Sequence, residues 1–470
     1  METKYKIILF ALILGSFMTA LDATIVAVAL PTIAHDMGEA GHDTSNISWV
    51  LLVYTLMLCC FILLWSKIGS NIGYRKVFIA GISIFTVSSL AIGACGLMPD
   101  VGLTAVIVLR GVQGLGAGMS MSMSLAMVSS YLPSESRGSC IGAVTLSSSA
   151  GTAFGPAIGG ILTSLHWSYI FFINVPIGLI CIFLCLRYMK VDEEIPAEKK
   201  KLDVVGAVLI LITLFSMTYY LNEGRELGWM SDIGIVLLVV MFVGAGLVAW
   251  WEQRAADPLI SMSMFKNENI LKSNIINLLL FMAISGCYLL LPYYLQYVKG
   301  METMQYGFVL IANSVGMMVA GPIVGKITDK TGNNRVFVIA GSLLAALGFL
   351  MMTRFSESTE LWFILLTLFI MGAGMGMALV AVTNHSFSFI RKGEDGLLSG
   401  LTNTFRQAGS SAGVAILNAV FMAFILTPIM GMTVGQILMP GFKHAFFVAA
   451  LMSMLAFVIA MSLRQKEETE

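Results

Sequence analysis

Apolar runs of about twenty residues recur along the whole chain, and this recurrence limits the possible folds more than any other feature. Of the 470 residues, 57% are hydrophobic and only 11% are charged, whereas a soluble domain carries about 25% charged residues. A helix of about twenty apolar residues crosses the roughly 30 Å of hydrocarbon in a bilayer. The sequence therefore predicts an all-α protein that crosses a membrane many times.

Fourteen of these runs are predicted to be membrane spans. The first follows Lys4 and Lys6, as the core of a signal peptide would, but it continues to Pro31, well beyond a signal core of about 7–15 residues. An even number of spans places both termini on one side. The spans cover roughly residues 7–33, 47–68, 75–97, 102–128, 138–164, 168–188, 204–222, 232–251, 270–295, 305–327, 335–353, 360–385, 396–425 and 442–463.

The distribution of lysine and arginine predicts which side that is. With a cytoplasmic N-terminus, the inside segments hold 21 of the 27 basic residues, and two more lie within spans. The outside segments hold only Arg225, Lys299, Arg354 and Lys443. Because cytoplasmic loops carry the excess of basic residues, both termini are predicted to be cytoplasmic, in a multi-pass protein of the cell (inner, cytoplasmic) membrane surrounded by lipid.

Three short stretches recur at a nearly constant offset, in corresponding spans of two sets of six. The pairs are 66–76 with 325–335 (offset 259), 148–153 with 410–415 (offset 262) and 116–119 with 372–375 (offset 256). They indicate duplicated halves, 1–190 and 269–470, separated by a segment (191–268) with a cytoplasmic linker and two extra spans. Duplicated halves with a binding site between them near the midplane are the plan of secondary transporters.

Asp22 is the only acidic residue that lies well inside a predicted span. It sits about 16 Å from the outer end of the first span, and Arg110 sits about 12 Å from the outer end of the fourth. An isolated charge at such depth is costly, so residues of this kind pair with one another and mark functional sites. We expect Asp22 to carry a proton with Arg110 as its partner; a permanent structural ion pair is the alternative.

Other polar residues inside spans are candidates for a substrate cavity. Arg406, about eleven residues into the thirteenth span, has no acidic partner at matching depth and is expected either to reach that cavity or to bond backbone carbonyls. The remaining candidates, each equally suited to a hydrogen bond between helices, are Thr24, Tyr54, Gln113, Tyr288, Tyr293, Asn313 and Asn403.

Small residues predict close packing in the fifth span and tight turns in two loops. In the fifth span, glycines recur every four residues beside a proline, which allows close helix approach and favours a kink; the residues are Gly151, Gly155, Pro156, Gly159 and Gly160. The repeated basic loops are predicted to be tight cytoplasmic turns with a gating role, and their residues are Gly73, Arg75, Gly325, Asp329, Gly332 and Arg335.

Several functions are not supported by the residues present. The segment 321–327 lacks the spacing and the Ser/Thr of a nucleotide-binding loop. The seven cysteines and five histidines show no metal-ligand spacing, and a net charge of zero does not suggest a nucleic-acid partner. We therefore expect no enzyme activity, metal, nucleotide or other cofactor, and a proton gradient as the energy source.

Taken together, these motifs resemble the major facilitator superfamily over essentially the whole chain, and within it the fourteen-span drug:proton antiporters of the multidrug efflux type. The matching segments are Leu21–Pro31 in the first span, Trp49 with Tyr54 in the second, Leu109–Gly114 in the fourth, Gly151–Gly160 in the fifth, Trp167–Gly178 in the sixth and Leu291–Gln296 in the ninth.

The resemblance implies a major-facilitator fold of two six-helix bundles plus two inserted helices. It also implies a part for Arg110 in proton transfer, and export of small lipophilic compounds, antibiotics among them, by alternating access. Relatives with dicationic substrates use further acids in the second half. This chain shows none there, which favours neutral, zwitterionic or singly charged substrates.

Two other functions stay open. One is a proton-linked or facilitative carrier of a single metabolite or lipid, which would differ from a multidrug exporter in the breadth of its substrates. The other is a non-transporting membrane scaffold or receptor, against which the embedded charge pair argues.

The first basic loop departs from the pattern of the antiporters it resembles. They carry Gly-x-x-x-Asp-x-x-Gly in this loop, and the aspartate helps to lock the cytoplasmic side shut. Here Ser66 and Ser70 replace the glycine and the aspartate, whereas the second copy keeps Gly325 and Asp329.

The departure predicts a protein that rests more inward-facing than its relatives. Ser70→Asp is then expected to strengthen the lock and to reduce maleimide labelling of a cysteine introduced on the cytoplasmic side. Labelling of the same cysteine in the Ser70 background is the control, and equal labelling in both would contradict the prediction.

Overall fold

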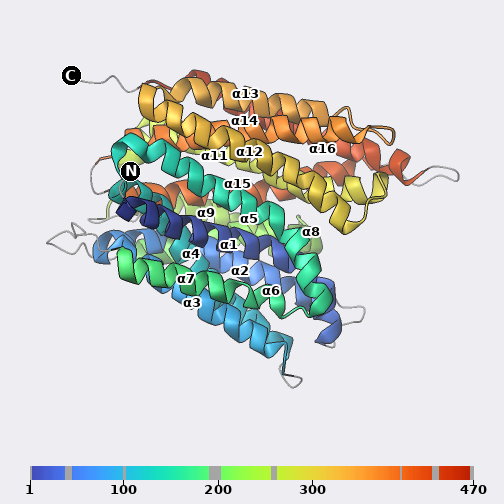
Figure 1. The fold of residues 1–470 in the computed structure, drawn as a ribbon, viewed down its shortest axis with the longest axis horizontal. Coiled ribbons are helices and arrows are strands. Elements are labelled where there is room, and N and C mark those ends of the chain that lie inside the picture. Colours follow the sequence, from blue (N-terminus) through green and yellow to red (C-terminus); the bar gives the residue numbers. More distant parts are fainter. Residues whose placement is uncertain are drawn as a thin grey trace. The chain divides into compact units, whose positions relative to one another are not determined.

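The computed structural model describes residues 3–37, 45–98, 102–189, 203–255, 262–391, 394–425 and 433–465. Over these residues the regular structure is helical, with no strands, as expected. Contacts divide the chain into two units (Figure 1). Unit 1 comprises Met1–Pro133, Phe154–Lys266 and Ile390–Thr404, and unit 2 comprises Ser134–Ala153, Asn267–Phe389 and Phe405–Glu470.

The helices of unit 1 are α1 (Thr3–Asp36), α2 (Ser45–Ile72), α3 (Tyr74–Cys95), α4 (Leu103–Tyr131), α6 (Tyr169–Phe172), α7 (Asn174–Tyr188), α8 (Val204–Leu227), α9 (Asp232–Glu252) and α10 (Met262–Lys266). Those of unit 2 are η1 (Ser134–Ser136), α11 (Glu268–Tyr293), η2 (Tyr294–Val298), α12 (Thr303–Thr331), α13 (Asn334–Met352), α14 (Leu361–Ser388) and α16 (Val434–Met461). Two helices, α5 (Arg137–Leu165) and α15 (Asp395–Ala423), each contribute one part to each unit.

Twelve helices in the described part of the chain are long and apolar enough to cross a membrane. The spans predicted at 138–164 and 396–425 fall on α5 and α15, which are not among the twelve. Both helices have 29 residues, but their glycines, serines and threonines make them less apolar than the others. The predicted count of fourteen spans is therefore not confirmed, although helices occupy all fourteen positions.

The two inserted helices are α8 and α9, which pack against each other, while α8 also packs against α2. Most of the predicted linker that precedes them, residues 190–202, lies outside the described residues. The division into 1–190, 191–268 and 269–470 stays a prediction.

Glycines bring α4 into backbone contact with two neighbours in unit 1. A Cβ on Gly114 would lie 2.5 Å from the backbone oxygen of Tyr54 on α2. A Cβ on Gly116 would lie 2.7 Å from the backbone oxygen of Gly81 on α3. Since real Cβ atoms do not approach other atoms this closely, only glycine allows α4 to lie directly against both helices.

The same arrangement recurs in unit 2, where Figure 1 shows α12, α13 and α14 side by side. A Cβ on Gly372 of α14 would lie 1.9 Å from the Asn313 oxygen on α12, and one on Gly374 would lie 2.3 Å from the Ala345 nitrogen on α13. Gly116 packs against α3, and Gly374 packs against α13 in the same way, so these two glycines are structurally equivalent at an offset of 258 residues. The sequence alignment had paired Gly116 with Gly372, which is two residues earlier.

The two basic loops form tight turns at glycines. Gly73 follows α2 with φ 106°, and Gly332 follows α12 with φ 64°, values that glycine adopts readily. Each amide closes the preceding helix, because Gly73 N donates to Gly69 O at 2.9 Å and Gly332 N donates to Thr328 O at 2.9 Å. The predicted turns are confirmed, and their gating role stays a prediction.

The loop arginines bind the C-terminal ends of other helices in their own units. Arg75 Nη2 donates to the carbonyl oxygens of Cys185 at 3.3 Å and Leu186 at 3.4 Å, near the end of α7. Arg335 Nη2 donates to the carbonyl oxygen of Met461, the last residue of α16, at 2.8 Å. Carbonyls in the last turn of a helix have spare acceptor capacity, so each arginine stabilises a helix end.

Asp329 binds the start of α5 within unit 2. Its Oδ1 accepts from Gly138 N at 2.6 Å, and its Oδ2 accepts from Ser139 N at 2.9 Å and Ser139 Oγ at 2.7 Å. A Cβ on Gly325 would lie 2.5 Å from Gly138 O, so this glycine permits the approach. A carboxylate is well placed at a helix N-terminus because the amides there are unpaired and carry partial positive charge.

In the first copy of the loop, Ser66, Ser70 and Tyr74 make hydrogen bonds through their hydroxyl groups. Ser70 Oγ donates to Lys67 O of its own helix at 2.8 Å. Near the start of α15, Gly396 N donates to the Tyr74 hydroxyl at 3.0 Å, and the Ser66 hydroxyl donates to Gly396 O. In unit 1 the described hydrogen bonds of Ser66 and Tyr74 connect the loop to a helix start, and in unit 2 the Asp329 carboxylate does so.

The glycine motif of the fifth span packs α5 against α1. A Cβ on Gly155 would lie 1.9 Å from Thr24 Oγ1, and one on Gly159 would lie 3.0 Å from Ile25 Cγ1. Among the described residues, nothing lies within 4 Å of a Cβ on Gly160. Gly155 and Gly159 thus permit close helix contact, whereas no described neighbour requires a glycine at position 160.

The other two residues of this motif are less informative. Gly151 is buried. The helix continues through Pro156, whose side chain lies outside the described side chains, and the predicted kink stays a prediction.

Gly155→Ala is expected to destabilise the protein by about 1–3 kcal/mol, the usual effect of inserting a methyl group into a packed contact. Gly160→Ala is the matched control and is expected to leave the free energy of unfolding unchanged. Unfolding of the purified variants in detergent measures both values. Equal effects of the two substitutions would contradict the assigned packing.

Candidate functional site

Asp22 on α1 and Arg110 on α4 form a buried ion pair in unit 1. Arg110 Nη1 donates to Asp22 Oδ2 at 2.6 Å, and both side chains are 0% exposed. Arg110 Nε donates to Val50 O on α2 at 3.0 Å. The structure thus brings together the two charges that the sequence placed at similar depth.

Two amide side chains bind the other carboxylate oxygen. Asp22 Oδ1 accepts from Gln113 Nε2 at 3.1 Å and from Asn174 Nδ2 at 2.9 Å. Gln113 Oε1 in turn accepts from Arg110 Nη1 at 2.6 Å. The carboxylate therefore receives three hydrogen bonds, which suit its ionised, acceptor-only form.

Ser89 on α3 completes the network. Its Oγ accepts from Gln113 Nε2 at 2.7 Å and lies 3.5 Å from Asn174 Nδ2. The network residues Asp22, Ser89, Gln113 and Asn174 are all buried. Because they come from α1, α3, α4 and α7, the charge pair depends on the packing of four helices.

Asn174 enters the network at a break in the sixth predicted span. That span consists of two helices, with α6 ending at Phe172 and α7 beginning at Asn174. Proline lacks an amide hydrogen and is best tolerated in the first turn of a helix, which is where Pro176 lies. Neither Asn174 nor Ser89 was predicted as a site residue, although Pro176 marked a place where a new helix could begin.

Three buried polar atoms around this network have no hydrogen-bond partner among the described residues. They are Tyr54 Oη, Arg110 Nη2 and Asn174 Oδ1. The Arg110 guanidinium carbon lies 4.3 Å from the centroid of the Tyr54 ring, a cation–π arrangement. Buried polar groups without partners are costly, so the site keeps hydrogen-bonding capacity that the ionised network does not use.

Arg406 on α15 is the second buried arginine. Within unit 2 its Nε donates to Asn277 Oδ1 at 3.3 Å and its Nη2 donates to Thr383 Oγ1 at 2.5 Å. Its guanidinium carbon lies 5.5 Å from the Phe281 ring centroid. Neither Asn277 nor Thr383 was predicted as a site residue, and no local feature marked them.

The remaining cavity candidates in unit 2 do not form one cluster. Tyr288 and Asn313 are bonded to each other, with the amide of Asn313 donating to the tyrosine hydroxyl. Tyr293 is 48% exposed and stacks on Tyr297. No contact in the described residues joins Tyr293 to the other candidates, and its cavity role stays a prediction.

The two polar candidates left in unit 1 bond to backbone. Thr24 Oγ1 donates to Leu21 O at 3.2 Å within α1. Asn403 Nδ2 donates to Met121 O on α4 at 3.0 Å. Both bonds suit structural roles, and cavity roles for these residues stay predictions.

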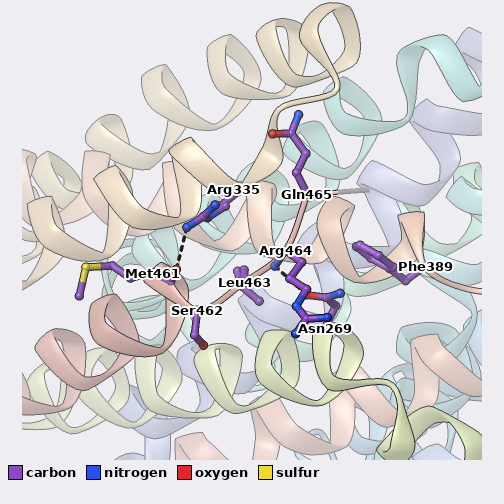
Figure 2. A pocket seen from close by; sticks show the side chains of 8 residues that line it. All are labelled: Asn269, Arg335, Phe389, Met461, Ser462, Leu463, Arg464 and Gln465. Carbon is purple, nitrogen blue, oxygen red and sulfur yellow. Dashed lines mark hydrogen bonds between the residues drawn. The ribbon is translucent and has the colours of Figure 1, made fainter. Parts of the chain in front are cut away.

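A pocket of about 710 Å³ lies at the ends of helices in unit 2 (Figure 2). It contains Arg335, bonded to Met461 O, and Arg464, whose backbone amide donates to Asn269 Oδ1 at 2.9 Å. None of the predicted cavity residues lines it, so it is separate from the buried arginine and carboxylate sites. Its lining residues are Asn269, Arg335, Phe389, Met461, Ser462, Leu463, Arg464 and Gln465.

Comparison with known proteins identifies the family. The sequence profile of the Major Facilitator Superfamily matches residues 12–414. The chain belongs to the major facilitator superfamily. It is therefore a multi-pass membrane transporter that acts on small substrates, not an enzyme.

Named transporters are similar over most of the chain. The multidrug resistance protein Stp of Mycobacterium tuberculosis (strain CDC 1551 / Oshkosh) is 32% identical over 427 residues, covering 90% of this chain and 77% of Stp. The riboflavin transporter RibZ of Clostridioides difficile (strain 630) is 27% identical over 422 residues, covering 90% of this chain and 89% of RibZ.

A solved structure confirms the major-facilitator fold. The crystal structure of the human organic anion transporter MFSD10 matches with a TM-score of 0.70 over 98% of this chain and 100% of that chain. At 14% sequence identity, the likeness concerns the fold alone.

Arg110→Gln is expected to destabilise the protein by about 3–5 kcal/mol, because it leaves the Asp22 carboxylate buried without its counter-charge. The double variant Asp22→Asn/Arg110→Gln removes both charges and is expected to recover most of that loss. Unfolding in detergent measures both, with Arg335→Gln as a control for removal of a positive charge elsewhere. A double variant as unstable as Arg110→Gln would contradict the assigned pairing.

Proposed function

We propose that this transporter exports small lipophilic compounds, drugs among them, in exchange for protons, with Asp22 as the proton-carrying residue. Transport proceeds by alternating access, and the proton gradient supplies the energy without a metal or cofactor. The observation that carries the proposal is the Asp22 carboxylate, 0% exposed and bound by Arg110, Gln113 and Asn174. An intramembrane acid with such partners is typical of proton pathways in pumps and transporters.

The network can hold the proton as well as release it. In the ionised state, Asp22 Oδ1 and Oδ2 accept from the three donors. On protonation one oxygen becomes a donor, and Asn174 Oδ1, which has no described partner, belongs to an amide that already contacts the carboxylate. A turn of the Asn174 amide would present its oxygen to the acid, so the site has two hydrogen-bonded arrangements, one for each protonation state.

The direction of transport and the membrane topology are parts of the same proposal. The relative Stp is named a multidrug resistance protein, and the glycine motif at Gly151–Gly160 resembles that of the fourteen-span drug:proton antiporters. We assign the chain to that group, with α5 and α15 added to the twelve candidate spans. The proposal includes cytoplasmic termini, and the excess of basic residues in the predicted inside segments supports this orientation.

A carrier of a single metabolite is the second candidate. The relative RibZ is named a riboflavin transporter, so close sequence relationship in this group does not require broad specificity. The two functions share the Asp22 site and differ in the number of compounds that engage it.

Proton release on substrate addition tests the proposal. The purified protein in weakly buffered detergent is mixed with a panel of neutral, cationic and anionic lipophilic compounds while pH is followed. We expect several compounds to release protons from the wild type and none to do so from Asp22→Asn, because the substrate-bound state holds the ionised network.

Binding of each compound is measured in parallel, so that a compound that binds without releasing protons is distinguished from one that does not bind. Substrate binding without release from the wild type would contradict proton coupling and leave Asp22 and Arg110 as a structural pair. Release by a single compound in the panel would favour the specific carrier. The double variant Asp22→Asn/Arg110→Gln is the control for stability, since it removes the proton site without leaving an unpaired charge.

A further inference from the structure

Arg406 is a buried cation without a described counter-charge. Its side chain is 8% exposed, and its polar partners Asn277 and Thr383 are both neutral. Within the described residues, no carboxylate forms an ion pair with it. Arg110, the other buried arginine, is neutralised by Asp22 at 2.6 Å. Buried charges are costly unless paired, so Arg406 is held in a state that an anion would stabilise.

The guanidinium is held in a fixed orientation. Thr383 Oγ1 accepts from Arg406 and donates to Leu379 O at 2.7 Å. Asn277 Oδ1 accepts from Arg406, while its Nδ2 donates to Ser273 O at 3.2 Å. Each partner is itself bonded to a helix backbone, so the arginine side chain is positioned before any ligand arrives.

Part of the guanidinium remains available. A guanidinium has five N–H donors, and the described bonds of Arg406 use one on Nε and one on Nη2. Nη1 makes none of the described bonds, so this end of the guanidinium keeps donors for a ligand. The Phe281 ring centroid lies 5.5 Å from the guanidinium carbon.

We infer that Arg406 binds the anionic group of the transported compound, and that the substrates include lipophilic organic anions with a carboxylate. The planar fork of arginine matches a carboxylate in two parallel hydrogen bonds. Phe281 supplies an apolar surface for the lipophilic part next to it. The inference rests on the proposed transport function and narrows its substrate class, because an unpaired cation at the site disfavours lipophilic cations.

Binding of matched compounds tests this inference. The probe is dansyl-leucine, a fluorescent lipophilic carboxylate, and its methyl ester is the neutral counterpart; two further aryl carboxylates and their esters extend the panel. We expect the wild type to bind the acids at least about tenfold more tightly than the esters, a preference typical of one charge-assisted contact. Arg406→Gln is expected to abolish the preference, and Arg406→Lys to retain part of it.

Two controls distinguish recognition of the carboxylate by Arg406 from effects of lost positive charge or misfolding. Arg335→Gln removes a positive charge at the pocket of Figure 2 and is expected to leave the preference for acids intact. Thermal unfolding identifies variants that fail to fold. If Arg406→Gln fails to fold, the preference for acids is measured in Arg406→Lys, which keeps the charge. Equal binding of acids and esters by the wild type, no binding of any acid, or an unchanged preference in Arg406→Gln would overturn the inference.

The outcome is independent of proton coupling. A preference for acids that depends on Arg406, without proton release, would support the anion site while contradicting the role of Asp22. Proton release by neutral or cationic compounds alone would support Asp22 and overturn the role of Arg406.

Discussion

The Asp22–Arg110 pair is the interaction on which the organisation of unit 1 depends. Two opposite charges with 0% exposure are stable in an apolar bundle only when they pair with each other and neighbouring groups bind them by further hydrogen bonds. The matching groups come from α3, α4 and α7, and Val50 of α2 accepts from the arginine. The site is thus a property of the packed helices, and it forms only when they reach their final positions.

Glycine makes that packing possible. Gly114 and Gly116 let α4 contact α2 and α3 at backbone distance, which places Arg110 and Gln113 within reach of Asp22. Gly372 and Gly374 do the same for α14 in unit 2. The two units nevertheless differ, because unit 1 holds a neutralised charge pair, whereas the described partners of Arg406 in unit 2 are neutral. This difference suggests a division between proton binding and substrate recognition.

The sequence was sufficient for the features that depend on local composition and depth. Apolar runs located the helices, the loop glycines predicted both turns, and matched depth predicted that Asp22 and Arg110 would meet. Features that need three-dimensional convergence were missed: Ser89 and Asn174 come from other helices, and nothing local marks them as partners of Asp22. Tyr293 was selected by residue type, and it is 48% exposed, which leaves its cavity role a prediction. The predicted count of fourteen spans is not confirmed, because α5 and α15 are not among the twelve candidate spans. Small and polar residues lower the hydropathy of these two helices.

The protonation state of Asp22 is the central claim, and infrared difference spectroscopy of its carboxyl group measures it most directly. Spectra of the purified protein with and without substrate are compared between the wild type and Asp22→Asn. If Asp22 carries the proton, the wild type shows a protonated carboxyl band that disappears when substrate is added. The Asp22→Asn variant lacks this band. A carboxylate that stays ionised with and without substrate across the pH range would contradict the central claim, and would leave the buried pair with a structural role alone.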